Sequence, residues 1–310
     1  MSKLLKSITE KAPQNTHSSS GREINKNIPN PSNPPSDNKE KSIMKKTRFI
    51  TRTVWRWLAL GITLSMSLIT DPVMSADDID PEADKILKSM SSYLAETKAF
   101  SMQADIDFEV VAKNGQKFQL SSFATAVLQR PDKLYIRRKG TIADIEFVFD
   151  GKTLTLYDKK RNIFAQIGAL GTIDDAIRAY ELETGIPAPG ADLLFANSYA
   201  ILSPGIESST YLGTAYVNGI ECHHLAFRED DFDWQLWVQS GTRPLPMKYV
   251  ITSKWQTAAP QYEIRFRDWV ANPQINNALF TFSAPTGAKR LETLPVNELD
   301  EFMSSIEEGK

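Results

Sequence analysis

The chain has 310 residues, 41% of them apolar and 24% charged, which are ordinary proportions for a globular protein. Residues 1–76 hold 12 Lys and Arg against 5 Asp and Glu, whereas residues 77–310 hold 24 against 33, a net charge of −9. So acidic a segment is a poor candidate for binding nucleic acid, because that affinity comes from neutralising phosphates, and we expect no nucleic-acid partner.

The polar stretch at residues 1–43, rich in Lys, Asn, Ser and Pro, cannot bury a hydrophobic core. We expect it to be a disordered leader, or to precede the true start of the protein at Met44.

Residues 44–76 have the three parts of a secretory signal peptide. The basic segment MKKTRFITRTVWR is followed by the apolar run Trp57–Ile69 and then by the small residues Ser75 and Ala76, at a cleavage site. The apolar run is short for a helix that spans a bilayer, which is the alternative interpretation. We therefore expect residues 77–310 to be a single domain in the periplasm.

A helix is predicted over residues 81–98. Asp80 and Pro81 are typical of a helix start, the first as N-cap and the second at the first helical position. Ile86, Met90 and Leu94 recur at helical spacing and predict one apolar face.

A first run of strands is predicted over residues 102–168. Apolar and polar residues alternate from Met102 onward, as in a strand with one buried and one solvated face. The pair Asn114-Gly115 is a strong hairpin signal, and later turn residues separate four more short strands.

A helical insertion interrupts this pattern. Thr172 and Asp175 have the spacing of a capping box, and Gly185 ends the predicted helix. The same helix carries Ile173, Ile177 and Leu182 on or near one face, which makes it a candidate lid. A short apolar helix is predicted at 192–197.

Five more strands are predicted over residues 209–270, then a short strand at ALFTFSAP and a weak helix at 295–309. Hairpin connections make neighbours antiparallel, and a sheet of about eleven strands must curl. The expected fold class is α+β, mainly antiparallel β: a curved, open (incomplete) β-barrel with helices covering its concave face.

The segment ECHHLAF contains the only cysteine and two of the three histidines. Neighbouring side chains of a strand point to opposite faces, so Cys222 and His224 share one face and His223 lies on the other. At most two of them can bind one ion, whereas a zinc site needs three or four protein ligands. We therefore expect a structural strand, no metal or cofactor, and a buried apolar role for Cys222.

The sequence motifs of common catalytic sites are absent: there is no G-x-S-x-G, H-E-x-x-H, P-loop or G-x-G-x-x-G. We expect no catalytic residues and no enzyme activity. The alternative is a hydrolase that uses His223 or His224 as general base with a nearby carboxylate.

Residues 211–255, with their G-x-x-C-x-H-L and D-W-Q-L-W segments, resemble a bacterial family of predicted periplasmic proteins of unknown function. The resemblance extends to RPDKLYIRRKG, FVFDGKTLTLYDKKRNIFAQI and the terminal FTFSAP. That family is similar to the LolA/LolB-like lipoprotein carriers, which share the RP-x-K-L strand and the DG-x-x-L-x-x-YD hairpin. The resemblance implies an incomplete barrel whose helices form a lid over an apolar cavity for acyl chains. No cysteine lies at the cleavage site, so we expect no lipid anchor.

We expect a non-enzymatic periplasmic protein that binds or carries an apolar or acylated small molecule, or a lipoprotein. The alternative is an envelope scaffold that binds a partner protein and fills its core with its own side chains. The candidate ligand-lining residues all lie on predicted apolar faces: Met102, Ile106, Phe108, Phe118, Leu120, Ile145, Phe147, Ile173 and Ile177.

Overall fold

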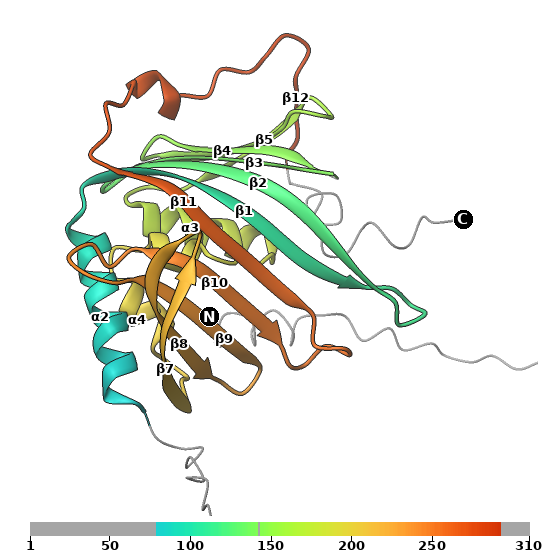
Figure 1. Cartoon of the computed structure of the whole chain (residues 1–310). Helices are drawn as coiled ribbons and strands as arrows, with labels where there is room; N and C mark the ends of the chain where they lie inside the picture. Colours follow the sequence, from blue (N-terminus) through green and yellow to red (C-terminus); the bar gives the residue numbers. More distant parts are fainter. Residues whose placement is uncertain (1–78, 142, 293–310) are drawn as a thin grey trace, which may run out of the picture. The chain divides into compact units, whose positions relative to one another are not determined.

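The computed structural model describes residues 79–141 and 143–292, which form α-helices, short 3₁₀ helices and one twelve-stranded sheet (Figure 1). The expected leader, signal peptide and C-terminal helix lie outside the described residues. The helices are α2 (Pro81–Glu96), α3 (Ile173–Thr184), η1 (Ala191–Leu194), α4 (Ser198–Leu202) and η2 (Asn277–Phe280).

The strands of the described residues form two runs on either side of the helical insertion. The first run is β1 (Ala99–Val111), β2 (Lys117–Gln129), β3 (Lys133–Gly140), β4 (Asp144–Phe149), β5 (Thr153–Asp158) and β6 (Ile163–Gly168). The second is β7 (Ser208–Val217), β8 (Ile220–Arg228), β9 (Phe232–Gln239), β10 (Pro246–Ser253) and β11 (Gln261–Ala271), followed by the two-residue β12 (Lys289–Arg290).

The sheet is open. Its strand order is β12-β6-β5-β4-β3-β2-β1-β11-β10-β9-β8-β7, and the pairs are antiparallel except β12 with β6. β1 pairs with β11 in the middle of the sheet and joins the two runs. The edge strands β7 and β12 lie at opposite ends, so the sheet curves without closing (Figure 1). The expected fold class, a curved and incomplete antiparallel barrel with helices, is confirmed.

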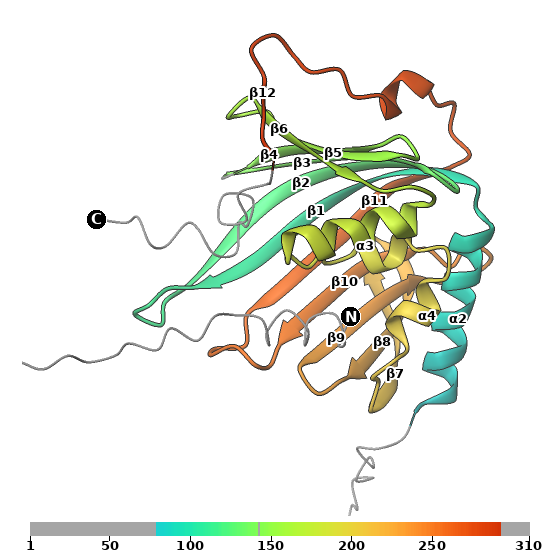
Figure 2. The same ribbon diagram turned by 180° about the vertical axis from the view of Figure 1, so that it is seen from behind.

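Helices α2, α3 and α4 lie on the concave side of the sheet (Figure 2). α2 packs on β7, β8 and β9, and α3 packs on β5 and β6. Asp80 fixes the start of α2, because its carboxylate accepts hydrogen bonds from the N–H groups of Glu82 (2.8 Å) and Tyr211 (2.9 Å), the second on β7. Two hydrophobic clusters result, one under α2 and one under α3, and Met102 and Trp269 pack against both.

Three details differ from the sequence expectations. Leu182 is 83% exposed, because it lies nine residues, or two and a half helical turns, after Ile173 and so on the opposite face of α3. The apolar insertion expected at 192–197 is η1 followed by α4. The segment ALFTFSAP is not a strand. The Asn276 side chain accepts a hydrogen bond from Ala278 N–H and starts η2, and the ring of Phe282 then packs against the rings of Tyr157 and Phe164.

Candidate functional site

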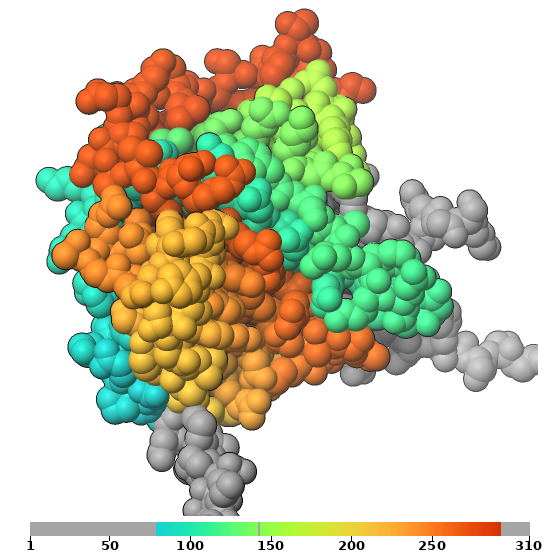
Figure 3. Space-filling view, in the orientation of Figure 1, coloured from blue at the N-terminus to red at the C-terminus, as the bar shows by residue number. Residues whose placement is uncertain are grey.

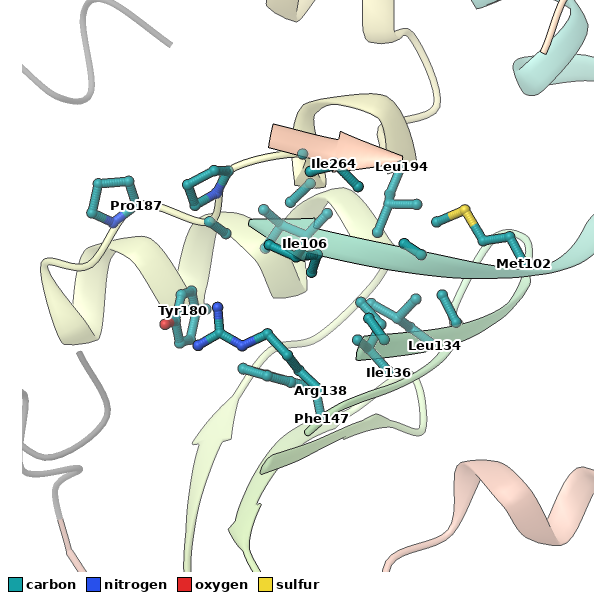
Figure 4. Close-up of a pocket in the computed structure, with 18 of the residues that line it drawn as sticks. Met102, Ile106, Leu134, Ile136, Arg138, Phe147, Tyr180, Pro187, Leu194 and Ile264 are labelled. Atoms are coloured by element: carbon teal, nitrogen blue, oxygen red, sulfur yellow. The ribbon is translucent and has the colours of Figure 1, made fainter. Parts of the chain in front are cut away.

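An apolar cavity of about 170 Å³ lies between α3, the loop at residues 186–191 and the inner face of the sheet (Figure 4). Small side chains make room for it. On the inner face Ala104 of β1 is directly opposite Ala124 of β2, and Met102 is opposite Ala126. All four line the cavity, so three alanines leave space where larger residues would fill the core.

Helix α3 forms one wall of the cavity through Ala176, Ile177 and Tyr180. A complete capping box fixes its first turn. Thr172 N–H and Oγ1 lie 2.8 and 2.7 Å from Asp175 Oδ2, and Asp175 N–H donates to Thr172 Oγ1 at 3.3 Å. The helix therefore begins at a defined residue, which sets the height of Ala176 and Ile177 over the sheet.

The loop at residues 186–191 closes a second wall and is tied to the end of α3. Ile186 N–H donates to Thr184 Oγ1 (3.1 Å), and Ala188 N–H donates to Glu181 Oε1 (3.4 Å). Burial raises the pKa of Glu181 above its usual value. Gly190 has a φ of +84°, which L side chains rarely adopt, and a Cβ there would meet the end of the Ile264 side chain, so glycine favours this close approach of the loop to β11.

One charged residue stands among the residues that line the cavity within the described part of the chain. Arg138 lies on the inner face of β3, because Leu134 and Ile136, four and two residues before it, also line the cavity. Arg137 points to the other face, where its guanidinium pairs with Asp144 (2.9 Å). Figure 4 shows Arg138 beside Tyr180, at the opposite end of the cavity from Met102 and Leu194.

The structure distributes the nine predicted lining residues over three settings. Four line the cavity, three lie in the cores and two lie on the β1–β2 hairpin, whose tip projects beyond the sheet (Figure 3). Phe118 on that hairpin is 43% exposed, because alternation continues past the point where α2 and α3 can cover it. The cavity residues are Met102, Ile106, Phe147 and Ile177, the core residues are Phe108, Ile145 and Ile173, and the hairpin residues are Phe118 and Leu120. A ligand-binding role for any of the nine stays a prediction.

A buried acidic pair lies outside the cavity. Asp192 of η1 and Glu229 after β8 are 7% and 3% exposed. Trp234 Nε1–H donates to Glu229 Oε1 at 2.7 Å, whereas within the described residues Asp192 Oδ2 and Glu229 Oε2 have no hydrogen-bond partner. Burial raises the pKa of Asp192 to about 7, and the carboxylates of Glu181 and Glu229 act in the same direction.

The cysteine and histidines of ECHHLAF lie on β8. Cys222 is fully buried. The ring of His223 hydrogen-bonds Tyr211 through Nδ1 (3.0 Å). His224 hydrogen-bonds Gln235 through Nε2 (2.9 Å) and stacks on Trp237 with ring centroids 4.1 Å apart. Both of these imidazole partners are neutral, so the contacts do not form the histidine–carboxylate pair that the hydrolase hypothesis needs. Within residues 79–141 and 143–292, no three His, Cys, Asp or Glu side chains gather in a way that could hold a metal ion.

The comparison with protein families decides where the chain belongs. The model of the DUF2092 family, described as predicted periplasmic proteins, matches residues 83–294. The chain belongs to this family. The match includes the twelve described strands, the cavity and all of α2 except its first two residues. This DUF2092 chain has no significant match among curated proteins. None of its described helices is long and apolar enough to cross a membrane.

Solved structures similar to this DUF2092 chain are distant in sequence. An uncharacterized conserved protein from Thermus thermophilus is 12% identical, with 68% of this chain and 99% of that chain covered and a TM-score of 0.40. LprF from Mycobacterium bovis is 14% identical, with 68% and 99% covered and a TM-score of 0.39. A LolA superfamily protein from Nitrosomonas europaea is 9% identical, with 64% and 97% covered and a TM-score of 0.33.

Proposed function

We propose that the protein is a periplasmic binding or carrier protein that holds an apolar or acylated ligand, without catalysis, in the cavity under α3. The cavity lining is the observation that carries this proposal, since it is almost entirely aliphatic and aromatic. Each methylene that leaves water for such a site contributes about 0.8 kcal/mol. A segment of acyl chain therefore gives useful affinity without any other contact.

The volume limits the size of what can enter. A cavity of about 170 Å³ is close to that of an engineered apolar cavity of about 150 Å³ that binds benzene, and smaller than pockets for drug-sized ligands, which start at about 300 Å³. One unbranched chain segment matches this space, whereas a larger acylated group requires α3 and the loop at residues 186–191 to move away from the sheet.

The first test is native mass spectrometry of the protein purified from the periplasm, followed by organic extraction. We expect a retained, extractable lipid. A protein that is empty and also fails to take up Nile red or fluorescent fatty acids would favour the alternative, an envelope scaffold that binds a partner protein.

A cavity-filling variant tests the location of the site. Ala126→Phe places a large side chain on the inner face of β2, and we expect it to weaken binding of a fatty-acid probe at least tenfold. Thr125→Phe is the matched control, because the neighbouring residue points to the other face. A folded Ala126→Phe protein that binds the probe as the wild type does would remove the cavity from the proposal.

A further inference from the structure

The Arg138 end of the cavity differs chemically from the rest of it. β3 lies between β2 and β4. In these two strand pairs Arg138 is directly opposite Ala124 of β2 and Ile145 of β4, which are both apolar and buried. Arg138 is also the last side chain that β3 directs inward, since the next inward position is Gly140, where the strand ends. A cation therefore stands at the rim of an otherwise apolar inner face.

A second polar group lies at the same end. Ser122 of β2 is opposite Gly140 of β3, two positions along from the Ala124–Arg138 pair and on the same inner face. Its side chain is 8% exposed, and within the described residues its Oγ has no hydrogen-bond partner. Ser122 is not among the residues that line the cavity, so its hydroxyl lies next to this end without reaching the space that a ligand would fill.

Tyr180 completes the wall on the helix side. Its ring contacts that of Phe147 edge-on, with centroids 5.7 Å apart, and both residues line the cavity. Phe147 is opposite Ile136 on the inner face, one inward position from Arg138. Arg138 and Tyr180 thus line one end of the cavity, while the opposite end at Met102 and Leu194 is apolar (Figure 4).

We infer that the ligand is a single-chain amphiphile with an anionic head group, bound with its carboxylate or phosphate at Arg138 and its chain directed toward Met102 and Leu194. This rests on the proposed function of the cavity. A guanidinium presents several N–H donors in a plane that matches a carboxylate or phosphate, and hydrogen bonds to charged groups are stronger than neutral ones. A cationic or neutral head group would gain nothing from Arg138.

The test uses the protein as purified from the periplasm and probes that share one twelve-carbon chain: dodecanoate, dodecyl phosphate, dodecanol and dodecylamine. Binding is measured below the micelle concentration by displacement of the neutral dye Nile red. We expect the wild type to bind at least one anionic probe about tenfold more tightly than dodecanol, and dodecylamine more weakly than dodecanol. The tighter of the two anionic probes distinguishes a fatty-acid source from a phospholipid source.

Variants assign the effect to its residues. Arg138→Met keeps an apolar stem without charge, and we expect it to bind all three non-cationic probes equally, with dodecanol unchanged from the wild type. Arg137→Met is the matched control, because it removes the same charge from the next residue on the outer face and should bind as the wild type does.

The outcomes separate the two proposals. If the wild type binds dodecanol as tightly as both anionic probes, or Arg138→Met weakens all probes equally, the anionic head group is wrong while the cavity site stands. If no twelve-carbon probe displaces Nile red, or Nile red itself does not bind, both the cavity site and the head group that depends on it are overturned. Circular dichroism of each variant verifies that it is folded.

Discussion

Asp192 is the residue whose ionisation depends most clearly on the fold. Its carboxyl group is buried beside the carboxylates of Glu181 and Glu229, and its pKa is raised from 3.8 to about 7. The folded protein therefore retains this proton between about pH 4 and pH 7, whereas the unfolded chain releases it. The contribution of Asp192 to stability is consequently most favourable below pH 4, decreases as the pH rises to 7, and is constant above that.

The variant Asp192→Asn tests this dependence. One pKa unit corresponds to about 1.4 kcal/mol, so the raised pKa lowers stability by up to about 4 kcal/mol between pH 4 and pH 7. We expect urea denaturation at pH 5 and pH 8 to show a smaller loss of stability in Asp192→Asn than in the wild type. Glu183→Gln, which removes an exposed charge from α3, is the control. Parallel pH profiles for Asp192→Asn and the wild type would contradict the assignment.

Cys222 is predicted to be unreactive in the native protein. Its side chain is fully buried, and burial raises the pKa of its thiol to about 11. The thiolate is the reactive form, so both its low population and its inaccessibility slow the reaction. We expect maleimide labelling at pH 7.5 to be slow in buffer and complete within minutes in denaturant. Stoichiometric labelling of the native protein within seconds would show that β8 opens readily.

Residue chemistry was only partly predictable from the sequence. Alternation in KLYIRRK places Leu134, Ile136 and Arg138 on one face, yet a charged residue near a strand end is by default assigned to solvent. The signal that could have identified Arg138 was its phase relative to the two apolar residues before it. Ser122 carried no comparable signal, because its lack of a hydrogen-bond partner depends on how β2 packs in the sheet between β1 and β3.

At the level of elements, the start of α3 determines the position of one cavity wall. Thr172→Ala removes the hydroxyl that accepts from Asp175 N–H, and loss of such an N-cap costs about 1 kcal/mol. We expect a fall of this size in the free energy of unfolding, measured by urea denaturation. Asp175→Ala removes the other half of the same box, so the double variant should lose less than the sum of the two single ones. Strict additivity would mean that the two groups act independently.

Elements with local signals were predicted well, and those fixed by tertiary contacts were not. The N-cap bonds of Asp80 to Glu82 and Ala83 and the Thr172–Asp175 box join residues within four positions of each other and formed as expected. ALFTFSAP alternates as a strand does, but it pairs with no strand within the described residues and therefore does not form one. The cavity also required the placement of α3 and the loop at residues 186–191 over Ala104 and Ala124, which no local pattern encodes.

At the level of the whole described domain, Arg130 connects three segments that are distant in sequence. From the end of β2 its guanidinium donates to the carbonyl oxygens of Leu194 (3.0 Å), Phe195 (3.3 Å) and Leu94 (3.4 Å), thereby joining η1 and α2 to the sheet. Burial lowers its pKa below the usual value for arginine.

We expect Arg130→Met to lower the free energy of unfolding by about 2–4 kcal/mol, because hydrogen bonds to a charged group contribute about 1.5–3 kcal/mol each and the carbonyls lose their partner. Arg130→Lys should recover little of this, since one ammonium group cannot reach all three carbonyls. The measurement is chemical denaturation, with Arg137→Met as the control. Equal stabilities for Arg130→Met and the wild type would show that water replaces the guanidinium.

The pairing of β1 with β11 has a consequence for the time at which the protein can fold. Phe108 of β1 and Tyr262 of β11 are paired in the sheet. β1 is synthesised before the other described strands. One of its edges therefore stays unpaired until residues 261–271 have been synthesised. Contacts this far apart in sequence slow folding. The first six strands must therefore remain a half-sheet with an open hydrogen-bonding edge. A nascent chain that ends before residue 261 is the species most exposed to aggregation, and a chaperone that binds extended strands would have to protect it.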